Sequence, residues 1–129
     1  MTALGRDAAM GFIHIPVSVK ALGHPFDHYE APFLIDTGAI DSMAPSDALQ
    51  RAGIEPVGKK TYELADGTRH EYQFGLVQIE FMGEVTAGRV IFGPDDAEPL
   101  LGVTALESVG ITIDPANRTL KRLPAIPLK

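Results

Sequence analysis

Glycines and prolines recur along the whole chain, and their spacing limits what it can fold into. The sequence contains 13 glycines and 10 prolines. They cut the chain into short segments separated by turns, which is the arrangement that many short strands require. We therefore expect an all-β domain.

The segments between these turns are rich in β-prone residues. The expected strands cover residues 12–19, 29–35, 59–64, 71–74, 76–82, 85–92, 111–114 and 119–123. The second of them ends directly at Asp36. Asp66-Gly67 lies between two β-prone runs, within Ala65-Asp66-Gly67-Thr68, and this dipeptide is a strong hairpin signal.

Two short helices are expected between the strands. Ser46 can cap the first through its hydroxyl, and Gly53 can close it in a left-handed conformation. Thr104 and Glu107 have the spacing of a capping box for a helix over 105–109, and Gly110 is its expected stop.

Length and charge exclude several classes of protein. At 129 residues the chain has room for one domain, which we assign to residues 1–129. With 17 acidic and 11 basic residues its net charge is −6, so a nucleic-acid partner is not expected. The absence of cysteine excludes disulfides, thiolate zinc sites and cysteine nucleophiles.

No signal peptide or membrane-length apolar stretch occurs in these residues, so we expect no membrane association and a cytoplasmic location.

The segment from Phe33 to Ala39 is the strongest candidate for chemistry. A hydrophobic run delivers the carboxylate of Asp36, the hydroxyl of Thr37 and the glycine Gly38 at its end. Burial of the flanking apolar residues favours a rigidly held acid, the Thr37 hydroxyl can hydrogen-bond to neighbouring backbone, and the glycine allows a tight turn beside a ligand. The same tripeptide is also common as a plain turn after a strand, so by itself it decides nothing.

Three motifs that occur in a fixed order are stronger evidence for a family than the Asp-Thr-Gly tripeptide alone. Asp36-Thr37-Gly38-Ala39 follows a strand, the Ala65-Asp66-Gly67 hairpin comes next, and Leu100-Leu101-Gly102 precedes a helix and a terminal strand pair. This order resembles the retropepsin-like aspartic peptidases, especially bacterial single-domain members, over a core of about residues 12–123. The resemblance implies a closed-barrel-like fold with one or two short helices.

The resemblance also implies roles for these residues. Asp36 would be the catalytic residue, supported by Thr37, Gly38 and Ala39. The hairpin over 62–72 would be a flap that closes over the substrate, and Leu100, Leu101 and Gly102 would pack beside the loop that carries Asp36.

Only one Asp-Thr-Gly is present, whereas this route to amide hydrolysis needs two facing carboxylates. We therefore expect a homodimer that cuts a protein or peptide substrate without a cofactor. Ala39 supplies no extra hydroxyl to the ionised pair, so we expect activity at mildly acidic to neutral pH.

Two departures from viral members stand near these motifs. Viral members usually carry Asp after the alanine and Arg after the later glycine, where this chain has Ile40 and Val103. Both halves of that ion pair are absent, so substrate binding should differ and the dimer should be weaker. Asp41 is expected either to contact substrate or to be a solvated turn residue.

The hairpin has two interpretations. As a flap, Ala65, Asp66, Gly67 and Thr68 would offer backbone groups to an extended peptide. As an ordinary exposed hairpin it would bind nothing. In either case Asp66 is expected to form the turn rather than act as a catalytic acid.

Other functions remain open at this level. A catalytically inactive module of the same fold could bind peptides or mediate dimerisation. A metal-dependent hydrolase could combine Asp36 with His24, His28 or His70, but Pro25 disfavours the helix that a zinc-binding His-x-x-x-His pair needs, and no metal is expected. The segment 119–128 resembles the terminal strand that interleaves at the dimer interface of viral members, although its prolines oppose a regular strand.

Overall fold

A computed structural model describes residues 13–23 and 27–128. The strands are β1 (His14–Ala21), β2 (Tyr29–Asp36), β3 (Ser42–Pro45), β4 (Gly58–Glu63), β5 (Arg69–Phe81), β6 (Glu84–Gly93), β7 (Leu100–Gly102), β8 (Ile111–Asp114) and β9 (Thr119–Arg122). The helices are α1 (Ser46–Arg51) and α2 (Val103–Ser108). The expectation of an all-β fold with two short helices is confirmed.

Six strands close into a barrel. The main sheet has the order β1-β2-β7-β3-β6-β5-β4, and an additional pairing of β1 with β5 closes the ring through β1, β2, β7, β3, β6 and β5. The barrel interior is apolar, with fully buried side chains that include Val17, Phe33, Ile79, Val90 and Leu101. Burial of these side chains is the main source of stability.

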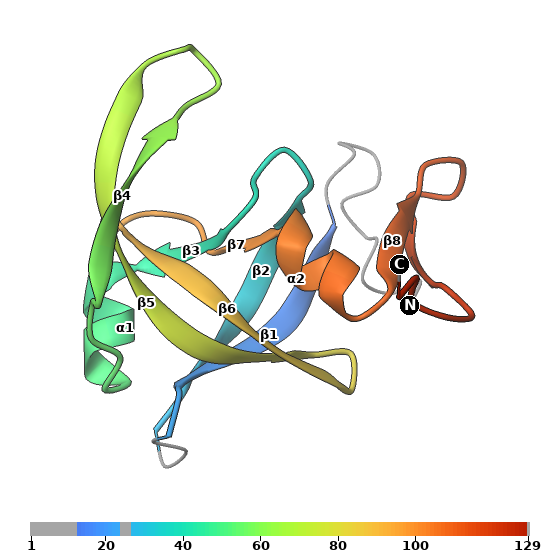
Figure 1. Cartoon of the computed structure of the whole chain (residues 1–129), viewed down its shortest axis with the longest axis horizontal. Coiled ribbons are helices and arrows are strands. Elements are labelled where there is room, and N and C mark those ends of the chain that lie inside the picture. Colours follow the sequence, from blue (N-terminus) through green and yellow to red (C-terminus); the bar gives the residue numbers. More distant parts are fainter. Residues whose placement is uncertain (1–12, 24–26, 129) are drawn as a thin grey trace.

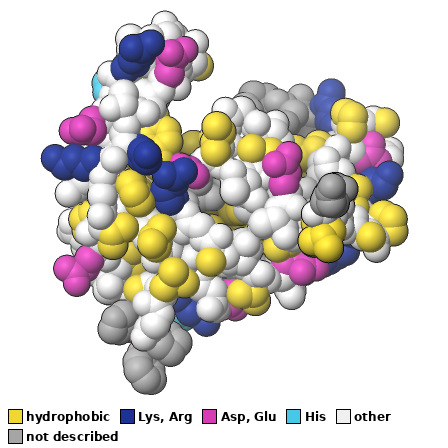
Figure 2. Space-filling model, in the orientation of Figure 1, with side chains coloured by type: hydrophobic (Ala, Val, Ile, Leu, Met, Phe, Trp, Pro, Cys, Tyr) yellow, Lys and Arg dark blue, Asp and Glu magenta, His cyan; other side chains and the backbone are white. Residues whose placement is uncertain are grey.

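Strand β4 lies outside the ring and pairs with β5. Together they form a long hairpin that projects from the barrel, and the loop between β2 and β3 lies at the same end of the molecule (Figure 1). In the space-filling view the tip of this hairpin stands apart from the rest of the surface, with a hollow between them (Figure 2). The β8–β9 hairpin forms a separate two-stranded sheet.

The strand predictions agree with the structure to within one or two residues at most strand ends, apart from two differences. Residues 71–74 and 76–82 belong to one strand, because Gly75 continues the ladder opposite Val90 instead of interrupting it. Strands β3 and β7 were not predicted as strands, since both are too short to show a pattern. The predicted start at Phe12 lies outside the described residues.

Both predicted helix caps are wrong. The Ser46 hydroxyl donates to the carbonyl of Gly93 at 2.7 Å, Pro45 occupies the cap position, and the Asp47 amide donates to Asp95 at 3.1 Å. Thr104 lies inside α2, which begins at Val103 and has no side-chain cap. The predicted stops are confirmed, because Gly53 and Gly110 have φ of +77° and +74°.

The chain after β9 does not continue as a strand. Residues 123–128 have no strand assignment, and Leu123, Ile126 and Leu128 expose 40%, 53% and 97% of their surface. None of the helices in the described part of the chain is long and apolar enough to cross a membrane.

Candidate active site

Asp36 is the last residue of β2 and lies next to Gly102 of β7. The two strands are parallel, with Leu34 opposite Leu100, Ile35 opposite Leu101, and Asp36 opposite Gly102. Phe33 and Ile35 point into the core and anchor the end of β2. The structure therefore brings the Asp36 motif and the Leu100-Leu101-Gly102 motif together, side by side.

The carboxylate of Asp36 is held by the turn that follows it. The Gly38 amide donates to Oδ1 of Asp36 at 3.0 Å, and the Ala39 amide donates to the Asp36 carbonyl at 3.1 Å. A Cβ at position 38 would lie only 3.3 Å from the same Oδ1, so the glycine permits the close approach. The Gly38 amide therefore fixes one oxygen of the Asp36 carboxylate. Asp36 is only partly buried, so its side chain is still accessible from the surface.

Thr37 points outward beside this carboxylate. It is exposed, and its hydroxyl makes no hydrogen bond to any part of the chain that the structure describes. The expected bond from Thr37 to neighbouring backbone is therefore not made within these residues. Its hydroxyl is available to a group from outside the chain.

The segment Asp36–Asp41, hereafter the active loop, is hydrogen-bonded to the first residues of α2. The amides of Val103 and Thr104 donate to the carbonyls of Ala39 and Ile40 at 2.8 and 3.2 Å. The first amides of a helix lack partners within it, and here the active loop supplies them. This explains why Thr104 is not needed as a cap.

The buried hydroxyl of Ser42 links the start of β3 to the end of β7, which the sequence alone did not indicate. Ser42 is 2% exposed, and its Oγ accepts the amide of Gly102 at 3.0 Å across 60 residues of sequence. A serine after a turn motif carries no signal of such a distant partner, so only the folded structure identifies it.

Asp41 is not a solvated turn residue, and that expectation is wrong. Its side chain is 8% exposed, accepts the hydroxyl of Tyr62 at 2.7 Å, and lies 3.2 Å from Nε of Arg89. Tyr62 comes from β4 and Arg89 from β6. The active loop therefore has an ion pair, although neither partner stands where viral members carry theirs.

The environment of Tyr62 changes its acidity. Burial, followed by the hydrogen bond to the Asp41 carboxylate, raises the pKa of Tyr62 to about 12. Both effects disfavour the phenolate, because a second negative charge would face Asp41. Tyr62 is therefore a neutral donor throughout the physiological range.

The face of the β4–β5 hairpin that carries Tyr62 is aromatic. His70 lies opposite Tyr62 in the ladder, and the ring of Tyr72 lies 6.2 Å from each of them. Further along, the guanidinium of Arg89 sits 5.4 Å from the centre of the Phe74 ring. Because Tyr62 reaches the active loop, this aromatic face is the one turned towards it.

The tip of the hairpin is a tight turn organised by Asp66. Its Oδ1 accepts the hydroxyl and the amide of Thr68 at 2.6 and 2.9 Å, and Gly67 has φ of +86°. The hydrogen bond from the Thr68 hydroxyl, then that from the Thr68 amide, lower the pKa of Asp66. Ala65 and the rest of the turn are exposed, and the tip of the hairpin projects from the barrel (Figure 1).

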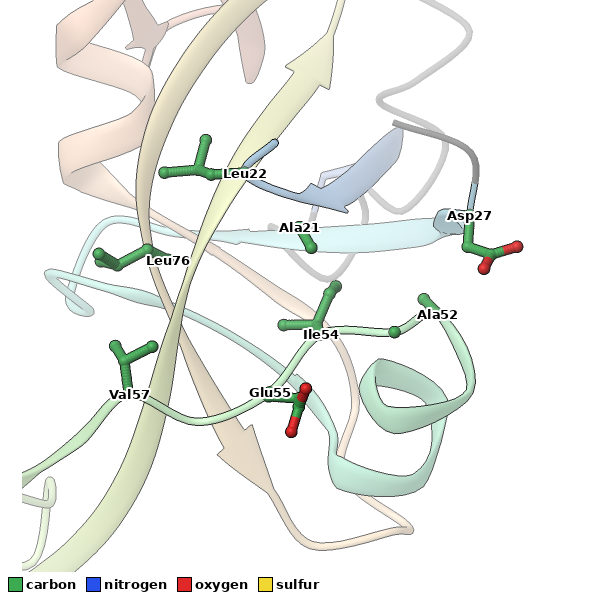
Figure 3. A pocket seen from close by; sticks show the side chains of 9 residues that line it. Ala21, Leu22, Asp27, Ala52, Ile54, Glu55, Val57 and Leu76 are labelled. Atoms are coloured by element: carbon green, nitrogen blue, oxygen red, sulfur yellow. The ribbon is translucent and has the colours of Figure 1, made fainter. Parts of the chain in front are cut away.

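A pocket of about 410 Å³ lies elsewhere, between the β1–β2 turn, the segment after α1 and β5 (Figure 3). Its lining includes Leu22, Ile54, Val57 and Leu76 and contains none of the predicted site residues.

Within residues 13–23 and 27–128, no cluster of three or more His, Asp or Glu is arranged to hold a metal ion. His24, one member of the histidine pair considered above, lies outside those residues.

Comparison with known sequences agrees with this geometry. The sequence model described as aspartyl protease matches residues 17–105, which is more than half of the chain. A comparison with curated proteins found no match.

The barrel, the Asp-Thr-Gly at the end of a strand and the parallel partner strand define a retropepsin-like aspartic peptidase domain. The chain belongs to the aspartyl protease family. Membership supports a protease-type function.

Proposed function

We propose that this chain is an aspartic endopeptidase that is active as a homodimer, with one Asp36 from each subunit. The observation that carries the proposal is the state of the acids in the active loop. Asp36 is held at one oxygen and accessible, whereas Asp41 is engaged by Tyr62 and Arg89. The loop thus offers one usable carboxylate per chain, and a twofold axis at this loop would supply the second.

Two such carboxylates would share one proton, because both cannot ionise cheaply at short separation. The ionised Asp36 would take a proton from a water molecule, whose oxygen attacks the scissile carbonyl carbon. The protonated Asp36 of the other subunit would donate to the carbonyl oxygen. Collapse of the tetrahedral intermediate breaks the C–N bond, and the amine leaves with a proton from the pair.

The rest of the site suits an extended peptide. The β4–β5 hairpin would act as a flap, with Ala65, Asp66, Gly67 and Thr68 at its tip offering backbone groups to the substrate. Leu100, Leu101 and Gly102, together with Thr37, Gly38 and Ala39, would keep the carboxylate in place. No cofactor enters this chemistry.

The test is cleavage of a mixed peptide library at high protein concentration, read by mass spectrometry from mildly acidic to neutral pH. Wild type should cut and Asp36→Asn should not. Asp96→Asn is the matched control, because Asp96 is exposed and outside the site. Light scattering on the same samples reports the dimer. A wild-type dimer that cuts nothing would favour a peptide-binding module of the same fold.

A further inference from the structure

Asp41 occupies a junction between three parts of the fold. It belongs to the active loop, Tyr62 belongs to the β4–β5 hairpin, and Arg89 belongs to β6 in the barrel wall. The Tyr62 hydroxyl and the Arg89 guanidinium both approach Oδ2 of Asp41, at 2.7 and 3.2 Å. One carboxylate oxygen therefore ties the projecting hairpin to the loop that carries Asp36.

The junction is too protected to be an incidental surface contact. The side chain of Asp41 is 8% exposed, and a carboxylate so buried must be paired to be tolerated. Arg89 provides the charge, and its own position is fixed by the Phe74 ring. Its guanidinium thus lies 3.2 Å from the carboxylate that accepts the Tyr62 hydroxyl and fixes the position of that carboxylate.

The hairpin needs such a support. Strand β4 pairs with β5 alone, so the outer strand has no neighbour in the sheet on its other side. A two-stranded ribbon that projects into solvent moves readily about its base. The Tyr62–Asp41 bond is the side-chain hydrogen bond that connects the described part of this hairpin to the active loop.

We infer that Tyr62, Asp41 and Arg89 form a latch that positions the β4–β5 hairpin over the active loop. These are positioning residues rather than catalytic ones. The bond joins two residues of the same chain and uses no atom of a ligand, so it can hold the hairpin in place before substrate arrives. Without the bond, substrate binding would have to order the hairpin, and the cost would appear in KM.

The first measurement does not depend on activity. The chain has no cysteine, so spin labels can be placed at Thr61→Cys, on the outer face of the hairpin, and at Gln50→Cys, on α1. Double-labelled protein is diluted into excess unlabelled protein, and the distribution of distances between the two labels in one chain is recorded by double electron–electron resonance. Tyr62→Phe should broaden this distribution.

Tyr72→Phe is the matched control. Tyr72 lies on the same face of the hairpin and contacts the Tyr62 ring, but its hydroxyl makes no hydrogen bond among the described residues. Its removal should leave the distribution narrow. A distribution that is equally narrow in wild type, Tyr62→Phe and Tyr72→Phe would overturn the latch.

The second measurement rests on the proposed peptidase activity. Tyr62→Phe should raise KM by about 10- to 100-fold, the range for losing a hydrogen bond to a charged acceptor, while kcat changes little. The effect should shrink in an Asp41→Asn background, where the acceptor is neutral. Effects of the two substitutions that simply multiply, or a fall in kcat at constant KM, would contradict positioning. If wild type cuts no peptide, the proposed function fails while the distance measurement still decides the latch.

Discussion

Replacing Gly102 by alanine would set a methyl group against the backbone of the active loop. The new Cβ would lie 2.6 Å from the carbonyl oxygen of Ile40 and 2.7 Å from the carbonyl carbon and oxygen of Asp41. Ordinary contact begins at 3.4 Å, so the backbone must retreat by up to about 0.8 Å. Gly102 has φ of −82° and ψ of 166°, which alanine adopts without strain, so the clash is the whole effect.

The loss of folding stability caused by Gly102→Ala can be bounded from these contacts. Overpacking typically destabilises by about 1–3 kcal/mol, and the upper end is expected because the atoms that must move are backbone, held by the amides of Val103 and Thr104. For a domain of this size we expect the melting temperature to fall by roughly 3–5 °C per kcal/mol. Urea unfolding followed by circular dichroism measures the free energy directly.

Gly88→Ala is the control for this experiment. Gly88 also lies in a strand, but its new Cβ would meet only the Cδ1 of Ile79, at 3.9 Å. Both substitutions restrict the unfolded chain alike, so their difference isolates the clash. Gly88→Ala should change stability by less than about 0.5 kcal/mol. If Gly102→Ala is as stable as Gly88→Ala, the close packing of β7 against the active loop is refuted.

Three further predictions concern stability and ionisation. Leu101→Ala removes a fully buried side chain and should cost about 2–5 kcal/mol in urea unfolding; a loss below about 1 kcal/mol would contradict the packing described. Thr68→Val removes the hydroxyl that does most to lower the pKa of Asp66, so the carboxyl pKa measured by NMR should rise towards 3.8, and an unchanged value would rule out that hydrogen bond as the cause. Because the folded-state pKa of Tyr62 is raised from 10.0 to about 12, its contribution to stability is complete below pH 10 and is lost as the pH rises towards 12. Tyr62→Phe should therefore lose less stability than wild type above pH 10, and parallel curves would disprove this.

Local patterns in the sequence predicted the parts of the fold that depend on local interactions. The Asp66-Gly67 turn formed as expected because its hydrogen bonds lie within three residues of one another. Gly53 and Gly110 end the helices because their left-handed conformation is a property of glycine itself. The barrel followed from the β-rich runs together with the resemblance to a known family.

The errors share a different cause, which is a partner far away in the sequence. The Ser46 hydroxyl binds Gly93 instead of capping α1, and the start of α2 uses the carbonyls of the active loop instead of Thr104. Asp41 was expected to contact substrate or to be a solvated turn residue, and the second alternative is wrong because its partners Tyr62, 21 positions later, and Arg89 could not be inferred from neighbouring residues. Tertiary contacts replaced the local pattern at each of these positions.

The central claim is that two Asp36 carboxylates from different chains act together, and a mixing experiment tests it most directly. Wild-type protein is allowed to exchange subunits with a ninefold excess of Asp36→Asn, and the rate of peptide cleavage per wild-type chain is measured against a parallel mixture with Asp96→Asn. With random pairing only about a tenth of the wild-type chains keep a wild-type partner, so with Asp36→Asn the rate per wild-type chain should fall to about a tenth of its value in wild type alone. In the Asp96→Asn mixture every chain keeps Asp36, so the rate per total chain should equal that of wild type. A rate unaffected by Asp36→Asn, in samples where subunit exchange is demonstrated, would show that one chain is sufficient and would contradict the account.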